Sequence, residues 1–313
     1  MKKFIVTTTV NKPTIATLKF CEIAVKDNWT FVIVGDTKTP HSYYEQLERD
    51  YYSNVVYLNP QKQDELYPEL SETIGWKSIQ RRNIGFVYAY NNGADIVATV
   101  DDDNIPYDGW GNNYIGKEIE VDLYTNISCN YFDPISPTNQ PDLWHRGFPI
   151  EYLPVKNNIE YKGKAKRIVL VQADFWDGDP DIDAICRLSK KPIVKFNNFN
   201  PFCSNQIAPF NSQNTFLSRL VIPYYAVLPH VGRMDDIWGS YILQYYFPNS
   251  MIYNKATVYQ DRNMQDLVTN LEKEVIGYRN TLKFLDNLSN FTSFFPEETK
   301  RFWEVYRKQF SNE

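Results

Sequence analysis

The sequence lacks closely spaced cysteines and long apolar runs, which are typical of disulfide-rich, zinc-binding and membrane proteins. Its four cysteines, Cys21, Cys129, Cys186 and Cys203, are widely separated and form no C-x-x-C pair. This spacing argues against a disulfide framework or a zinc site and favours reduced, buried thiols. No apolar run approaches the roughly 20 residues that cross a bilayer, and the N-terminal apolar stretch is shorter than the ~7–15 residues of a signal-peptide core. We therefore expect a soluble, cytoplasmic protein with no transmembrane segment.

An excess of positive charge is also missing. The formal net charge of −5 argues against a general nucleic-acid binder, which would carry a basic stripe. Aromatic residues are abundant instead, at 16% with 23 tyrosines. Their faces pack on the apolar C–H faces of sugars, although most such rings simply fill the core. The 313 residues suffice for one α/β domain or two small ones.

Strand-like and helix-like segments alternate through the first hundred residues. The expected strands cover residues 4–9, 29–34, 55–58 and 96–100, and the expected helices cover residues 14–25, 41–51 and 76–90. This alternation predicts an α/β fold in which a parallel sheet has helices on both faces.

The second half is less regular. Residues 130–165 are rich in Pro, Asn and Gly and predict a long loop. Further strands are expected at 168–171, 211–217, 223–227 and 256–259, and helices after Asp179, from Asp235, over residues 264–285 and from Pro296. The pattern predicts a catalytic domain over residues 1–262 and a helical extension over 263–313, whose helices pack on that domain or form a homo-oligomer.

Three consecutive carboxylates follow the apolar strand at 96–100. If the strand continued, Asp101 and Asp103 would point one way and Asp102 the other. Like charges so close repel each other unless a cation or water screens them. Mg²⁺ or Mn²⁺, which takes one or two carboxylates plus phosphate oxygens, is the natural partner. The alternative is a solvated acidic turn before Pro106.

Basic residues precede this strand. In a helix over 76–90, Lys77 and Arg81 form an i, i+4 pair with Arg82 beside them. Two cations one turn apart, leading to an acidic strand end, could hold a diphosphate. For Lys77 the alternative is a solvated basic face.

Polar residues also follow the first two strands. Thr8, Thr9 and Asp36 lie where those strands end. Ligands of open α/β sheets sit beyond the carboxyl ends of the strands, so these side chains are expected on one rim with the three aspartates. Taken singly, each also suits an ordinary turn.

An acidic pair opens a later helix. Asp235 or Asp236 could be a simple cap or, if the helix points at the site, a general base for an acceptor hydroxyl. His230, five residues earlier than Asp235, could bind a metal or phosphate or be structural.

An apparent calcium loop can be excluded. The aspartates at 177, 179, 181 and 183 alternate, but Ile182 stands where an EF-hand needs glycine and Leu188 where it needs glutamate. Asp179 before Pro180 fits a helix N-cap better.

The string QRRNIGFVYAYNNGADIVATVDDDN, residues 80–104, resembles the core of GT-A glycosyltransferases. The resemblance implies a Rossmann-like mixed sheet, a nucleotide-diphospho-sugar donor and a divalent cation. It also implies that Asp101 lies near the ribose, Asp103 at the metal and diphosphate, and Arg81 or Arg82 near the nucleotide. Thr8, Thr9 and Asp36 would then contact base and ribose.

Four blocks in the same order, VDDDN, HRGFP, WDGDPDIDA and MDDIWGSY, are similar to STELLO-type glycosyltransferase-like proteins and, more distantly, to UDP-arabinopyranose mutases. In the mutases an arginine in an R-G-Y-P string is reversibly glycosylated, and the matching position is Arg146, although Phe148 replaces the tyrosine. Asp236 matches an acidic position near acceptor or sugar.

The preferred interpretation is a glycosyltransferase that depends on Mn²⁺ or Mg²⁺ and uses a nucleotide-diphospho-sugar, with UDP-sugar favoured, and a glycan or other hydroxyl acceptor. The alternatives are a sugar-nucleotide mutase acting through Arg146 and a catalytically silent binding scaffold.

Overall fold

The computed structural model describes residues 1–262 and 265–310. Its first half is built on four parallel strands in the order β3-β2-β1-β4. Their bounds are Lys3–Thr9 for β1, Thr30–Gly35 for β2, Val55–Leu58 for β3 and Ile96–Val100 for β4. All five residues of β4 are buried, as expected for a parallel strand covered on both faces. The four predicted strands are confirmed to within two residues.

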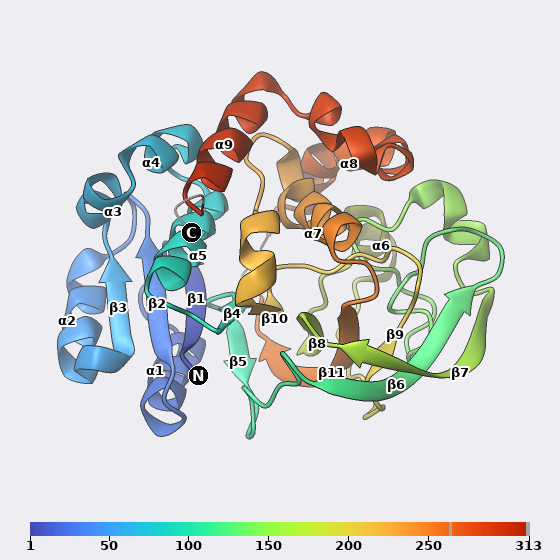
Figure 1. The fold of residues 1–313 in the computed structure, drawn as a ribbon, viewed down its shortest axis with the longest axis horizontal. Helices are drawn as coiled ribbons and strands as arrows, with labels where there is room; N and C mark the ends of the chain where they lie inside the picture. Colours follow the sequence, from blue (N-terminus) through green and yellow to red (C-terminus); the bar gives the residue numbers. More distant parts are fainter. Residues whose placement is uncertain (263–264, 311–313) are drawn as a thin grey trace.

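The sheet is mixed rather than wholly parallel. Strand β10 (Asn214–Ser218) pairs antiparallel with both β4 and β8 (Val171–Gly178), and β8 pairs parallel with β11 (Met251–Gln260). Short β5 (Asn104–Pro106) pairs with β11, and the sheet continues through β9 (Phe202–Cys203), β6 (Glu118–Asn126) and β7 (Ile159–Ile168). The expected mixed sheet is confirmed, and an all-parallel sheet is wrong beyond β4 (Figure 1).

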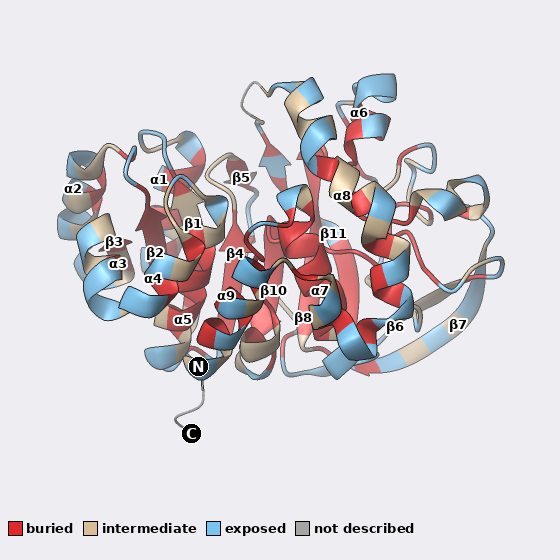
Figure 2. Cartoon of the chain, turned by 90° about the horizontal axis from the view of Figure 1, so that it is seen from above, coloured by how far each residue is buried: buried red, intermediate tan, exposed pale blue. Residues whose placement is uncertain are grey.

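Helices cover the sheet on its outer sides, with their exposed faces toward solvent and the central strands buried (Figure 2). The helices are α1 (Ile15–Lys26), α2 (His41–Tyr51), α3 (Pro60–Leu66), α4 (Pro68–Ile74), α5 (Arg82–Asn91), α6 (Ala184–Lys190), α7 (Asp235–Tyr246), α8 (Leu267–Asp286) and α9 (Glu297–Lys308). The sequence patterns did not indicate α3 and α4, each of which begins at a proline.

Several predicted elements are wrong. The helix expected over 76–90 begins only with a 3₁₀ turn at Ile79–Arg81, because Lys77 has a left-handed φ of 61°. Residues 223–227 form no strand: residues 223 and 224 end the 3₁₀ segment Arg219–Tyr224, and residues 225–227 have no regular secondary structure. Helix α6 is capped by Asp183, whose side chain accepts from the Cys186 amide, and not by Asp179. The loop expected over 130–165 ends earlier, at β7.

The C-terminal helices pack on the same chain (Figure 1). The buried Glu274 of α8 accepts from the Ala184 amide at 2.7 Å and from Arg233 Nε at 2.8 Å. In α9, Tyr306 donates to the carbonyl oxygen of Tyr225 at 2.7 Å. The extension therefore covers the sheet domain. Residues 263–264, where this extension was expected to begin, lie outside the described residues.

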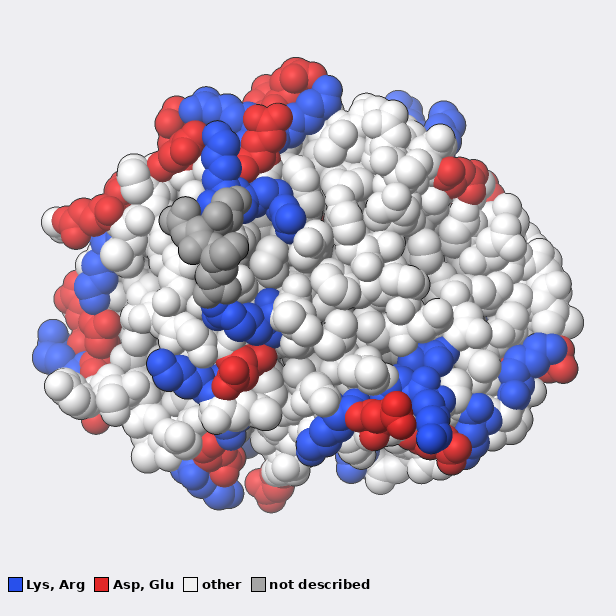
Figure 3. Space-filling model, in the orientation of Figure 1, with Lys and Arg blue, Asp and Glu red and all other residues white. Residues whose placement is uncertain are grey.

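Charged side chains on the face in Figure 3 gather near its margin, where the two signs alternate, and its middle is largely uncharged. All four cysteines are described: Cys21, Cys186 and Cys203 are buried, Cys129 is half-buried, and none is disulfide-bonded. Within residues 1–262 and 265–310, no helix combines the length and apolarity that a membrane span requires.

The close packing of α5 on β1 and β2 depends on Gly85. A Cβ at this position would lie 2.4 Å from Val6 Cγ1 and 3.0 Å from Val34 Cγ2. We expect Gly85→Ala to lower the free energy of unfolding by roughly 1–2 kcal/mol, because the overpacking outweighs the gain in helix propensity. Chemical denaturation tests this, with the exposed Lys19→Ala of α1 as control. A variant as stable as that control would contradict the expectation.

Candidate active site

Two adjoining cavities lie beyond the carboxyl ends of β1, β2 and β4. The larger, which we call the central cavity, has a volume of about 550 Å³, and the smaller, the side cavity, about 380 Å³. Thr8, Ile79 and Asp102 line both. The central cavity holds nine of the residues nominated from sequence: Thr8, Arg82, Asp101, Asp102, Asp103, Arg146, His230, Asp235 and Asp236. The side cavity holds the other four: Thr9, Asp36, Lys77 and Arg81.

The three consecutive aspartates leave the strand at Val100 and enter a turn, so the expected alternation of their side chains is absent. Asp101 accepts from Arg82, and its amide donates to Asn104 Oδ1 at 2.9 Å. Asp102 accepts from Thr9 Oγ1 and, at 3.0 Å, from Asn11 Nδ2. Among the described residues, the carboxylate of Asp103 accepts a hydrogen bond only from Gln260 Nε2, at 3.2 Å.

The electrostatics of this turn favour a cation. Burial, with the charge of Asp101 beside it, raises the pKa of Asp103 to about 7. Burial also raises the pKa of Asp102, although hydrogen bonds from Thr9 and Asn11 oppose the shift. A divalent ion would relieve this repulsion and hold Asp103 in its ionised form.

The residues fit a metal ion that is shared with a ligand. Among the described residues, no three His, Cys, Asp or Glu side chains are grouped so that they could hold an ion by themselves, so the set Asp101, Asp103 and His230 does not make a closed site. Mg²⁺ and Mn²⁺ bound to phosphates need only one or two carboxylates. Asp103, with one amide donor and a raised pKa, is the side chain that best fits this role.

Arg82 is buried and holds the acidic turn in place. Its NH1 donates to the carbonyl and hydroxyl oxygens of Ser212, both at 2.7 Å, and its NH2 donates to Asp101. Burial alone would lower its pKa, but Asp101 raises it above the usual value. Arg82 therefore binds Asp101, and its expected place near the nucleotide stays a prediction.

Arg81 is turned away from the acidic turn. Its Nε donates to Gln63 Oε1 at 2.6 Å and its NH2 to Ser71 Oγ at 2.8 Å, and its guanidinium stacks 3.5 Å from the Trp76 ring centre. Burial lowers its pKa to about 10. Lys77 precedes the helix, so the predicted i, i+4 pair of cations does not exist. Lys77 is exposed at the side cavity, where it remains available to an anion.

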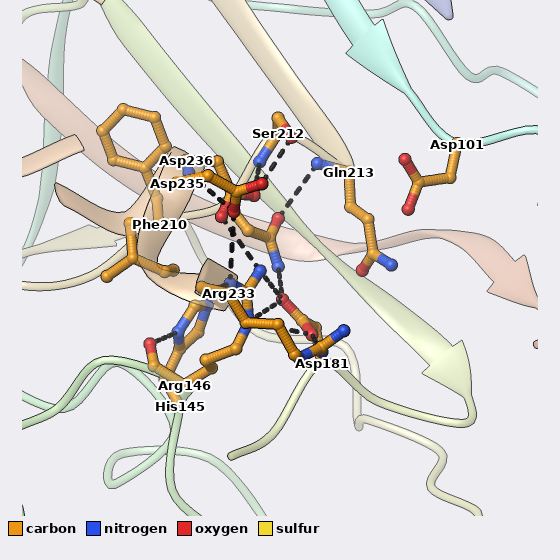
Figure 4. Close-up of polar contacts among 12 residues, drawn as sticks. Asp101, His145, Arg146, Asp181, Phe210, Ser212, Gln213, Arg233, Asp235 and Asp236 are labelled. Atoms are coloured by element: carbon orange, nitrogen blue, oxygen red, sulfur yellow. Dashed lines mark hydrogen bonds and ion pairs between the residues drawn. The ribbon is translucent and has the colours of Figure 1, made fainter. Parts of the chain in front are cut away.

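Arg146 is the centre of a buried charge network (Figure 4). Its NH2 lies 2.8 Å from Asp181 Oδ2 and 3.0 Å from Asp236 Oδ1, and its NH1 lies 3.8 Å from Asp235 Oδ1. NH1 also donates to the carbonyl oxygen of Arg233. Burial would lower the pKa of Arg146, but the aspartates raise it well above the usual value. The guanidinium is thus bonded to two carboxylates and to a backbone carbonyl oxygen.

This network gives the two aspartates at the start of α7 different properties. Burial would raise the pKa of Asp236, yet Arg146 lowers it below the usual value, helped by the Ser212 amide and hydroxyl at 2.9 and 3.0 Å. Burial and the neighbouring Asp236 raise the pKa of Asp235 to about 7, and Gln80 Nε2 donates to it at 2.7 Å. Asp236 is thus the ionised member of the pair near neutral pH.

Sequence patterns missed Arg262, which also lines the central cavity. Its side chain is buried, and within the described part of the chain neither Nε nor NH2 has a hydrogen-bond partner. These atoms lie 3.7 Å from Asp179 Oδ2 and 3.8 Å from Asp181 Oδ1. A buried guanidinium with unused donors beside acidic groups suits an anionic ligand. Arg262 follows the strand predicted over residues 256–259, and this position could have identified it as a candidate site residue.

No protein-family model matches the chain. In sequence it is similar to two curated proteins of Arabidopsis thaliana, "Probable glycosyltransferase STELLO2", with 23% identity over 193 residues, and "Probable glycosyltransferase STELLO1", with 22% over 197. The chain is thus similar to proteins described as probable glycosyltransferases. The matches cover 56% and 55% of the chain but only 23% and 24% of the relatives, so this glycosyltransferase-like chain spans about a quarter of their length.

A solved structure with some likeness is that of S. aureus TarS, residues 1–349. It aligns with a TM-score of 0.42 and 11% sequence identity, over 99% of this chain and 81% of the TarS chain.

The raised pKa of Asp235 predicts a pH dependence of stability. Since the carboxyl titrates at about pH 7 when folded and near pH 4 when unfolded, the folded state binds more protons between these values, and stability falls as pH rises through that window. We expect Asp235→Asn to remove part of this fall and to be more stable than the natural protein at pH 8 by roughly 1–3 kcal/mol.

Urea denaturation at pH 5 and pH 8 measures this difference, with the exposed Asp142→Asn as control. If the natural protein and Asp235→Asn lose the same stability between the two pH values, the buried acid is not titrating in that range.

Proposed function

We propose that the protein is a metal-dependent glycosyltransferase that moves a sugar from a nucleotide-diphospho-sugar, with UDP-sugar favoured, to a hydroxyl of a glycan. The observation that carries this proposal is the central cavity, where the Asp101–Asp103 turn and the Asp235–Asp236 helix start face the same space. The side cavity opens beside it and offers separate room for a nucleoside. Similarity to two glycosyltransferases supports the same reaction class.

The nucleoside would lie in the side cavity. Asp36 accepts from the Ser78 amide at 3.0 Å and from Thr37. Although burial alone raises its pKa, these donors lower it below the usual value. An ionised carboxylate beside the Thr8 and Thr9 hydroxyls suits hydrogen bonds to ribose hydroxyls.

The diphosphate would lie between the two cavities. Asp103 and Asp101 would hold Mn²⁺ or Mg²⁺, which neutralises the leaving diphosphate when bound. Lys77 lines the side cavity and Arg262 the central cavity, so each could contact a diphosphate placed between the two. The unused donors of Arg262 make it a better diphosphate ligand than Arg81, whose donors are already engaged.

The acceptor hydroxyl would approach Asp236. Arg146 keeps that carboxylate ionised, and its Oδ1 makes no geometrically favourable hydrogen bond among the described residues. Asp236 can therefore take the proton from the hydroxyl as it attacks, if the sugar anomer inverts. If the anomer is retained, Asp236 positions the acceptor.

Calorimetry with UDP, GDP and their sugars in Mn²⁺ tests the donor site. We expect Asp103→Asn to weaken Mn²⁺-dependent binding at least about 10-fold, because it removes a charged ligand. Asp236→Asn should bind the donor as the natural protein does and lose about 10²–10⁴-fold in transfer rate, because it removes the base.

Asp142→Asn, which changes an exposed carboxylate, is the control for both. Binding of no nucleotide diphosphate in Mn²⁺, or equal binding with and without the metal, would rule out the proposed donor site. Loss of donor binding in Asp236→Asn would show that this carboxylate belongs to the donor site instead.

The mutase alternative requires Arg146 to attack a sugar. Because Arg146 is buried and paired with Asp181 and Asp236, we expect no stable label on the protein after incubation with radiolabelled UDP-sugar. Label that stays with the denatured natural protein and is absent from Arg146→Lys would favour the mutase. Asp142→Asn again serves as control.

A further inference from the structure

A third cavity lies away from the residues described so far. Its volume is about 910 Å³, and we call it the outer cavity. Four segments border it: the loop after β5, Asp177 near the end of β8, the segment 195–198, and residues 254–257 of β11. None of the nominated catalytic or donor-binding residues lines it.

A bulge in β11 contributes part of the lining of the outer cavity. Pairing with β8 runs in register up to Asn254 and resumes at Val258, which leaves Lys255, Ala256 and Thr257 unpaired with β8. Bulges re-aim side chains and are frequent next to functional sites. Here the bulge places Lys255 and Thr257 at the cavity, so the strand that carries Gln260 to the central cavity also builds this one.

The lining combines aromatic faces with amides. Tyr107 and Tyr114 border the cavity with 40% and 36% of their surfaces exposed. The hydroxyl of Tyr107 donates to the buried Asp177 at 3.0 Å, which orients the ring. Asn197 and Asn198 have amide side chains that form no hydrogen bond within the described part of the chain. Exposed rings and free amides match the C–H faces and hydroxyls of sugars.

The charge of the lining favours an acidic ligand. Lys117, Lys195 and Lys255 border the cavity with two carboxylates, of Asp108 and Asp177. Asp177 is already satisfied by Tyr107 and by the Phe196 amide at 2.8 Å. Among the described residues, the ammonium groups of Lys195 and Lys255 have no hydrogen bond or ion pair, so they can bind carboxylate or phosphate groups on a ligand.

Two segments of the chain contribute lining residues to both the outer cavity and the central cavity. Asp103, just before β5, lines the central cavity, and Tyr107, just after β5 and four residues further along, lines the outer cavity. On β11, Gln260 lines the central cavity, and Thr257, three residues earlier, lines the outer cavity. At about 3.3 Å per residue, these pairs of lining residues are roughly 10–13 Å apart along the backbone, a length comparable with that of a short oligosaccharide.

We propose that the outer cavity binds a carbohydrate chain that carries acidic groups, and that this chain is the acceptor glycan, held several sugar units from the hydroxyl that is glycosylated. The acceptor role rests on the proposed function; the binding of an acidic oligosaccharide does not.

The test uses the full chain and calorimetry with tetragalacturonate, neutral maltotetraose and inorganic phosphate. We expect tetragalacturonate to bind more tightly than either other probe, and the Lys195→Gln/Lys255→Gln variant to weaken its binding about 10-fold, with the difference shrinking at high salt. The control Lys19→Gln/Lys26→Gln, which removes two exposed charges from α1, should bind as the natural protein does.

Equal binding in the two double variants overturns the proposal, as does binding of maltotetraose or phosphate as tight as that of tetragalacturonate. UDP titrated in Mn²⁺ into the same variants separates this inference from the proposed function. Unchanged UDP binding with weakened tetragalacturonate binding supports the outer cavity alone. If the natural protein binds tetragalacturonate but no nucleotide diphosphate, the proposed function and the acceptor role fail and the carbohydrate site stands.

Discussion

The structure around the candidate site depends on the burial of one guanidinium, that of Arg146. It joins a loop, the segment after β8 and the start of α7 through Asp181 and Asp236. Removing one partner of such a group leaves an uncompensated buried charge, which commonly costs about 3–5 kcal/mol. The network therefore fixes the start of α7 against the cavity and, by the same electrostatics, keeps Asp236 ionised while Asp235 holds a proton up to about pH 7.

A second buried arginine organises the opposite wall. Arg82 binds Asp101 and Ser212, and Ser212 in turn donates to Asp236. The acidic turn and the acidic helix start are thus connected through Arg82 and Ser212. Helix α8 completes the cavity with Asn270 and Lys273, so the C-terminal extension contributes to the site rather than merely covering the sheet.

Local sequence signals could predict much of this arrangement. The apolar runs at 55–58 and 96–100 have the composition of buried parallel strands and were found at the same residues in the structure. Because parallel strands end on one edge of a sheet, the polar residues that follow them had to share a rim, and Thr8, Asp36 and the three aspartates do so. The general location of the site is therefore a consequence of chain order and strand direction.

The sequence by itself determined the first four strands, their polar ends and the acidic pair at the start of α7, since these depend on residues close together along the chain. Only the tertiary structure decided that Arg81 packs on Trp76, that Arg146 meets an aspartate 35 residues away, and that Arg262 is buried with two nitrogens that form no hydrogen bond to the described residues. The pKa of Asp235 also belongs to the tertiary structure, because burial and a neighbouring charge, which no local pattern encodes, set the proton affinity of a carboxylate.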